Sequence, residues 1–151
     1  MSVYPLELNP ISLIGDTMTC TALVTQSTGT PTLEEWAKLD LNVPNSCVLR
    51  LTRVQLDDNN QPLSVEEVVL ALERFPGLAV NGGDVPDIVE LAQRHGLALG
   101  RATERLSIVR ATKDVATHLQ IAPGVDVLRL NRIVETADGD PVEWRVTFRK
   151  M

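Results

Sequence analysis

The chain has 151 residues, of which 44% are hydrophobic and 23% are charged, and it carries a formal net charge of −6. This length predicts a single globular domain whose core needs neither a disulfide nor a metal ion for stability. The excess of 20 Asp and Glu over 14 Lys and Arg argues against a nucleic-acid interface, which is typically basic. Aromatic residues make up 3% of the chain, too few for the stacking platforms of single-strand binders. The chain by itself is not expected to bind DNA or RNA.

The rare residues of the chain form no metal or targeting signature. Two histidines and two cysteines, Cys20 and Cys47, lack metal-ligand spacing, so we expect no metal, no cofactor and two buried, reduced thiols. The chain has no run of about 18 apolar residues, and its N-terminus lacks the basic and apolar regions of a signal peptide. These absences predict a cytoplasmic protein that does not interact with membranes.

Residues 1–18, which contain two prolines, are predicted to form an irregular arm or a linker remnant, so that the domain proper spans residues 19–151. Thr32 and Glu35 have the spacing of a capping box and predict a helix that runs to about Leu41. The first regular element of the domain is thus expected to be a short helix.

The next segment has the pattern of a β-hairpin. Residues 48–56 alternate in polarity as a strand does, and residues 57–61 form a polar turn. Residues 62–70 are predicted to form the second strand, which passes into a short helical stretch before Phe75. The first half of the domain is therefore a helix followed by a hairpin.

A further helix is predicted at about residues 85–95, between the two halves of the chain. Asp84 can cap this helix, Pro86 suits its first turn and Gly96 ends it. The glycine-containing loop at residues 81–83 before it is expected to be flexible.

The last third of the chain repeats the signals of a helix and a hairpin. A strand around residues 106–109 is followed by Thr112, a plausible cap for a helix that ends before Pro123. The pair Asp138-Gly139 predicts a tight hairpin turn, and residues 142–148 alternate as its closing strand.

The sequence contains an internal duplication. Residues 48–53 recur as residues 127–132, and the same offset of 79 residues aligns three further pairs without a gap. These pairs are Ala37 with Ala116, Pro44 with Pro123 and Pro62 with Pro141. The chain is therefore predicted to form two pseudo-symmetric helix–hairpin halves that share one sheet. The fold class is α+β, an antiparallel sheet of about five to six strands with helices packed against it.

Two arginines hold equivalent positions in the two copies. Strand alternation places Arg53 and Arg132 on the same face as the apolar leucines of their strands. A buried, unpaired charge is very costly, so each arginine needs an anion. That anion is either an internal carboxylate (Glu66, Asp57 or Glu143) or the phosphate or carboxylate group of a ligand. The strand pattern leaves both interpretations open.

No motif typical of an enzyme occurs in the chain. The sequence lacks a GxSxG element, a P-loop, a GxGxxG fingerprint and a convincing Ser/His/Asp set. We therefore expect no catalytic residue.

Taken together, the motifs resemble those of a known family. In the first half they are Arg53, Pro62, Glu66, Phe75-Pro76-Gly77-Leu78 and a helix closing on His95-Gly96. In the second half they are Arg101-Ala102-Thr103-Glu104, Pro123-Gly124, residues 127–132 and Asp138-Gly139 followed by Pro141-Val142-Glu143. Over about residues 20–150 their order and spacing resemble the UTRA domain, the effector-binding module of GntR-type transcription regulators of the HutC subfamily.

The resemblance implies a chorismate-lyase-like fold, a homodimer and a pocket for a small-molecule effector such as an anionic metabolite. UTRA domains normally follow an N-terminal winged helix-turn-helix domain. That domain is absent here, so contact with DNA is expected only through such a missing domain. The implied function is to sense an effector that modulates DNA binding of the full-length regulator.

The resemblance also implies which residues bind the effector. Arg53 matches the first residue of an Arg-x-Arg pair, and Gln55 stands in place of the second. Glu66 and Glu143 match acidic residues that face the effector or lie at the far side of the pocket. With Arg132 from the duplication, these five residues form the predicted effector site.

Two other functions stay open. A chorismate-lyase-like enzyme of the same fold would use Arg53, Arg132 and a glutamate to bind two carboxylates and to assist elimination of pyruvate. The family's Ser-x-Tyr element is replaced here by Pro86-Asp87-Ile88, which removes hydroxyl donors. This loss makes a carboxylate or a less polar effector at least as plausible as a sugar phosphate, and it also allows a ligand-free dimerisation domain.

Overall fold

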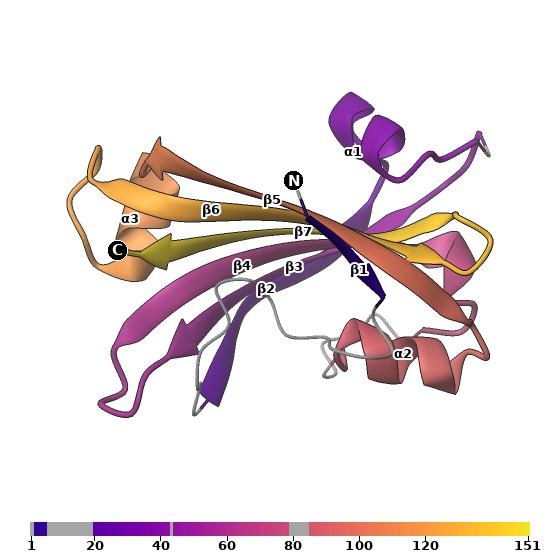
Figure 1. Cartoon of the computed structure of the whole chain (residues 1–151), viewed down its shortest axis with the longest axis horizontal. Coiled ribbons are helices and arrows are strands. Elements are labelled where there is room, and N and C mark those ends of the chain that lie inside the picture. The colour runs from indigo at the N-terminus through magenta and orange to yellow at the C-terminus, as the bar shows by residue number, and fades with distance from the viewer. Residues whose placement is uncertain (1, 6–19, 43, 79–84) are drawn as a thin grey trace.

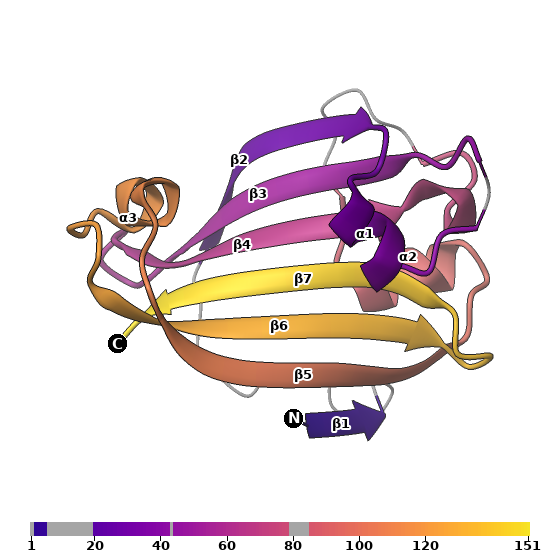
Figure 2. The same ribbon diagram turned by 90° about the horizontal axis from the view of Figure 1, so that it is seen from above.

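The computed structural model describes residues 2–5, 20–42, 44–78 and 85–151 and shows one antiparallel sheet with helices on both faces (Figure 1 and Figure 2). The strands are β1 (Ser2–Pro5), β2 (Cys20–Gly29), β3 (Val48–Leu56), β4 (Pro62–Ala71), β5 (Leu99–Arg110), β6 (Asp126–Thr136) and β7 (Pro141–Lys150). The helices are α1 (Leu33–Lys38), the 3-10 turn η1 (Leu72–Arg74), α2 (Ile88–Arg94) and α3 (Lys113–Leu119). The strand order is β1-β5-β6-β7-β4-β3-β2, which confirms the predicted α+β class.

The helices divide the core into clusters on the two faces of the sheet. Figure 1 shows α1 and α3 on one face and α2 under one end of the other face. The cluster beneath α2 includes Leu51, Phe75 and Leu91, each 2% exposed or less. On the opposite face, Trp144 belongs to the cluster near α1 and Val115 to the cluster near α3. Both faces of the central strands are therefore buried at least in part.

The duplication predicted from the sequence is built into the sheet. An offset of 79 residues relates β2, α1, β3 and β4 to β5, α3, β6 and β7, in that order. Strands β4 and β7 are neighbours, and Glu66 pairs there with Thr147 and Glu67 with Val146. The offset converts Glu67 into Val146 and Glu66 into Arg145. The pseudo-twofold axis therefore passes between β4 and β7, with one half of the sheet on each side (Figure 2).

Local signals fix the two duplicated helices. The Thr32 hydroxyl accepts from the Glu35 backbone N–H at 3.1 Å, and the Glu35 carboxylate accepts from the Thr32 N–H at 2.8 Å, which confirms the capping box. The Arg50 side chain lies 2.6 Å from the same carboxylate and lowers the pKa of Glu35 by its hydrogen bond. Thr112 caps α3 as predicted, because its hydroxyl accepts from the Val115 N–H at 3.3 Å.

The prediction of an irregular N-terminal arm is wrong for residues 2–5. Ser2–Pro5 form β1, which pairs antiparallel with residues 101–104 of β5. The outer edge of β5 offers unpaired backbone groups that such a segment satisfies. This strand brings the sheet to seven strands, against the five to six expected. The rest of the predicted arm, residues 6–18, lies outside the described residues, and the domain boundary at residue 19 stays a prediction.

Three further details differ from expectation. Helix α1 ends at Lys38, earlier than the predicted Leu41. Helix α2 is capped by Asp87, whose side chain accepts from the Val89 N–H, while Asp84 and the loop at 81–83 lie outside the described residues. Cys47 is exposed rather than buried, since it lies in the loop before β3.

The longest α-helices of the described residues have seven residues, so none reaches the length and hydrophobicity needed to cross a bilayer.

Candidate functional site

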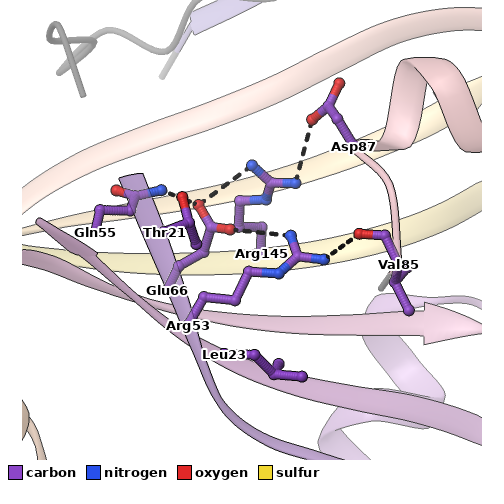
Figure 3. Close-up of a pocket in the computed structure, with 8 residues that line it drawn as sticks. All are labelled: Thr21, Leu23, Arg53, Gln55, Glu66, Val85, Asp87 and Arg145. Atoms are coloured by element: carbon purple, nitrogen blue, oxygen red, sulfur yellow. Dashed lines mark hydrogen bonds and ion pairs between the residues drawn. The ribbon is translucent and has the colours of Figure 1, made fainter. Parts of the chain in front are cut away.

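A polar pocket of about 470 Å³ lies on the α2 face of the sheet, next to the cluster that α2 covers. Its lining consists of Thr21 and Leu23 of β2, Arg53 and Gln55 of β3, Glu66 of β4, Arg145 of β7, and Val85 and Asp87 before α2 (Figure 3). The volume falls within the range of about 300–1,000 Å³ that is typical of small-molecule sites. The pocket draws on both halves of the duplicated sheet and on the segment that leads into α2.

Glu66 lies at the centre of the polar network of the pocket. Its side chain is only 5% exposed, and its Oε2 accepts from Gln55 Nε2 at 2.9 Å and from Arg145 Nη1 at 3.3 Å. Its Oε1 lies 3.6 Å from Arg53 Nη1. Gln55 is held in turn by the Ser64 hydroxyl, which donates to its Oε1. Because a buried carboxylate is stable only with such partners, Glu66 ties the β3–β4 hairpin to β7.

Arg53 reaches the pocket through the strand phase that the sequence predicts. It alternates with the buried residues Leu49 and Leu51 on the face that α2 covers. Its Nη2 donates to the carbonyl oxygen of Val85 at 2.6 Å, so β3 holds the segment that leads into α2. The side chain is 14% exposed and lines the pocket, so part of it is accessible to a ligand.

Arg145 is the second arginine of the pocket. Its Nη2 donates to Glu143 Oε2 at 2.9 Å and lies 3.7 Å from Asp87 Oδ1 (Figure 3 shows the Asp87 contact). Burial alone would lower the pKa of Arg145, but the surrounding carboxylates, Glu143 first, outweigh burial and raise it. Arg145 is therefore a permanent cation between the buried carboxylates of Glu143 and Glu66 and the carboxylate of Asp87, which is 57% exposed.

The pair formed by Arg132 and Glu143 lies behind the pocket. Arg132 Nη2 donates to Glu143 Oε1 at 2.8 Å, and the two side chains are 4% and 1% exposed. Burial alone would raise the pKa of Glu143, but the guanidinium groups of Arg145 and Arg132 outweigh burial and lower it. Neither residue of the pair lines the pocket, and Glu143 is linked to it through Arg145.

The structure brings together three of the five residues predicted as the effector site. Arg53, Gln55 and Glu66 line the pocket, and their role in binding stays a prediction. Arg132 and Glu143 instead form an internal ion pair, the alternative that the strand pattern left open. Their strand phase is as predicted, but both side chains are buried behind the lining, and their role in effector binding stays a prediction.

Sequence reasoning missed three polar residues of the lining, Thr21, Asp87 and Arg145. A signal for Arg145 exists in the duplication, because the offset of 79 residues makes it the equivalent of Glu66. Asp87 stands where the family's hydroxyl-bearing element is expected, which is a weaker signal. Thr21 faces Gln55 in the pairing of β2 with β3, and no local pattern reveals that register.

The arrangement is suited to binding a small polar molecule. Its two cations and two anions are Arg53, Arg145, Glu66 and Asp87. Leu23 and Val85 add apolar surface for the carbon skeleton of a ligand. Within residues 2–5, 20–42, 44–78 and 85–151, no group of three or more His, Cys, Asp or Glu side chains is arranged to hold a metal ion.

Solved structures that share this fold include a transcriptional regulator. The chain is similar to a GntR-family transcriptional regulator from Enterococcus faecalis, with a TM-score of 0.77 and 22% identity, covering 86% of this chain and 92% of that one. It is also similar to PhnF from Mycobacterium smegmatis, with a TM-score of 0.75 and 22% identity, covering 86% of this chain but only 57% of PhnF. Against the effector domain of PhnF alone, TM-score, identity and coverage of this chain are the same, and the match covers 79% of that domain. At these identities the likeness establishes the shared fold.

The fold that the chain shares with these structures holds a polar pocket of the size of a small-molecule site. The family model of the UTRA domain matches residues 18–149. The chain belongs to the UTRA domain family, as its motifs imply. Its assignment to the HutC subfamily stays a prediction.

Proposed function

We propose that this domain is the effector-sensing part of a GntR-type transcription regulator, in which a small molecule bound in the pocket modulates DNA binding of the full-length protein. The observation that carries the proposal is the set of elements that the pocket joins. A ligand there contacts both halves of the sheet and, through Arg53 and Val85, the segment that leads into α2. Such a ligand can favour one arrangement of these elements over another, which is what a sensor requires.

DNA contact is proposed to come from a winged helix-turn-helix domain of the full-length regulator. The net charge of −6 supports this division, because an acidic domain is poorly suited to a phosphate backbone. The match covers 57% of PhnF, which leaves room for a second domain in a protein of that length.

A ligand screen and a DNA-binding assay together test the proposed sensing function. Thermal-shift measurements on the domain against aromatic acids, amino acids and phosphorylated sugars are expected to find a stabilising ligand. That ligand is expected to change the affinity of the full-length regulator for its operator. A screen without a stabilising ligand, or a ligand that leaves DNA affinity unchanged, would refute the proposal.

We propose that the pocket binds its ligand without converting it. An elimination reaction needs an acid that can donate a proton at the reacting atom. Glu66 is engaged by Gln55 and Arg145, and the pKa of Glu143 is lowered behind the pocket by Arg145 and Arg132 against the effect of burial. An ultraviolet assay for release of 4-hydroxybenzoate from chorismate is therefore expected to show no activity, and a turnover signal would overturn this part.

We propose that the domain acts as a homodimer. Leu106 and Ile108 on β5 are 45% and 59% exposed, and a second copy covering them would remove apolar surface from water. Light scattering of the domain is expected to give the mass of a dimer, and Ile108→Glu is expected to give a monomer. Leu33→Glu is the matched control, because Leu33 is 91% exposed on α1. A monomeric parent domain would contradict the dimer, and a dimeric Ile108→Glu would contradict this surface.

A further inference from the structure

Asp87 differs from the other carboxylates that contact Arg145. Glu66 and Glu143 are 5% and 1% exposed and accept hydrogen bonds from Arg145 at 3.3 and 2.9 Å. Asp87 is 57% exposed, and its Oδ1 lies 3.7 Å from Arg145 Nη2, beyond hydrogen-bond distance. Two anions are therefore fixed on the guanidinium by hydrogen bonds, and the third is held loosely beside Nη2.

We propose that the pocket takes a small molecule with a single carboxylate and no other charge, and that this carboxylate binds Arg145 in the place that Asp87 holds in the free domain. The inference rests on the proposed function and names the class of its ligand. Asp87 can leave Arg145 at little cost, since most of its side chain is already in water. It keeps a role after leaving, because its Oδ2 accepts from the Val89 N–H at the start of α2.

The charges of the lining limit the ligand to one negative charge. In the free domain, Arg53 and Arg145 balance Glu66 and Asp87. A carboxylate that replaces Asp87 restores this balance, and one of its oxygens can take the place of Asp87 Oδ1 beside Arg145 Nη2. A phosphate monoester carries about two charges at pH 7 and would bring the second one close to the buried Glu66.

The other two charged side chains of the lining, Arg53 and Glu66, are already engaged by the protein. Arg53 donates from Nη2 to the Val85 carbonyl at 2.6 Å and lies 3.6 Å from Glu66 through Nη1, so it can assist Arg145 in holding one anion but does not balance a second anion. Glu66 accepts from Gln55 and from Arg145, so it is not free to hold an ammonium group. A ligand with one carboxylate and an otherwise uncharged skeleton fits these constraints, with Leu23 and Thr21 available to its far end.

The test uses matched probes on the domain that differ only in the charged group. Each aromatic or aliphatic skeleton is measured by calorimetry as its carboxylate, its amide and its phosphate monoester. We expect a carboxylate to bind at least about tenfold more tightly than its amide and its phosphate ester. An amide or a phosphate ester that binds as tightly as its carboxylate overturns the inference but leaves the proposed function intact. If no compound binds, in this panel or in the wider screen, both fail.

A substitution at Asp87 separates displacement from simple binding. Asp87→Ser removes the competing carboxylate but keeps a side chain that caps helices. It is expected to tighten carboxylate binding about two- to fivefold, because an exposed ion pair of this kind contributes little. Glu90→Gln is the matched control, since it removes the same charge on α2 from a residue paired with Arg94. Unchanged or weaker binding by Asp87→Ser, or equal tightening by both variants, would rule out displacement of Asp87.

Discussion

Arg53 and Arg132 hold equivalent positions in the two halves of the molecule, yet their surroundings differ. In the pairing of β2 with β3, Arg53 faces Leu23, which is 42% exposed on the outer strand. In the pairing of β5 with β6, Arg132 faces Glu104, which is fully buried. Arg53 therefore opens onto a pocket, and Arg132 is enclosed in an ion pair with Glu143. The duplication fixes the strand phase of both arginines, and the elements that differ between the halves decide what each does.

The two halves also differ at the junction of β4 and β7, in the centre of the sheet. Glu66 and Arg145 are equivalent under the offset of 79 residues, and they contact each other across the junction of β4 and β7. A carboxylate in one copy and a guanidinium in the other make this contact attractive, whereas two identical side chains would repel. Opposite charges at equivalent positions allow two similar hairpins to join around a polar centre.

The largest effect on stability is expected from Arg132→Ala. The substitution removes one partner of the buried Glu143, so we expect a loss of about 3–5 kcal/mol in the free energy of unfolding. Urea denaturation of the domain measures it. Arg101→Ala is the control, because Arg101 is 63% exposed in its ion pair with Glu135, and a loss below about 1 kcal/mol is expected. Equal losses in the two variants would contradict the enclosed role of Arg132.

Arg53→Ala sharpens the comparison, because it removes the equivalent arginine from the other half. Glu66 keeps Gln55 and Arg145 as partners, so the expected loss of stability is about 1–2 kcal/mol, smaller than for Arg132→Ala. The same urea titration measures it. A loss as large as that of Arg132→Ala would mean that Arg53 serves the fold rather than the pocket.

The duplicated helices give the smallest expected effect. Glu35→Gln removes the charge that closes the capping box of α1 and pairs with Arg50, and about 1 kcal/mol is expected at pH 7. Asp114→Asn is the control at the position of α3 that the offset of 79 residues relates to Glu35; there Thr112 caps the helix through the Val115 N–H, and Asp114 is the acidic residue of the first turn. A few tenths of a kcal/mol is expected for the control, about the size of a helix-dipole contribution.

The effect of Glu35→Gln is also expected to depend on pH. The hydrogen bond from Arg50 is the main cause that lowers the pKa of Glu35 from its ordinary value of 4.5. A carboxylate with a lowered pKa in the folded state stabilises above its unfolded pKa, and this stabilisation is lost as the pH falls through the folded pKa. The difference between the parent domain and Glu35→Gln should therefore shrink below pH 4.5. A difference that stays constant down to pH 3 would argue against the charged pair.

Local patterns in the sequence were sufficient for most of the fold. The capping box of Thr32 and Glu35, the strand phase of Arg53 and the turn at Gly139, whose φ is +88°, each depend on residues close in the chain. The start of α2 was predicted too early, because Asp84 and Asp87 can both cap a helix and the sequence alone does not show which of them does so. Strand β1 was missed because its four residues are stabilised by β5, far away in the chain.

The residues of the candidate site also differ in whether local patterns or long-range pairing place them. Arg53, Gln55 and Glu66 lie on one hairpin, so their common face follows from strand alternation. Arg145 reaches the pocket only because β7 pairs with β4, a contact between distant segments that no local pattern predicts. The enclosure of Arg132 depends on the register of β5 and on the side chains that cover Arg132. No local pattern in the sequence reveals either of them.

Calorimetric titration of the parent domain and Arg53→Ala with the tightest ligand from the screen tests the central claim most directly. We expect Arg53→Ala to weaken binding about tenfold or more, as the loss of a charged contact does. Arg74→Ala, which removes an arginine paired with Asp140, should leave the affinity unchanged. An Arg53→Ala domain that binds every ligand as tightly as the parent would contradict the assignment of this pocket as the sensor site.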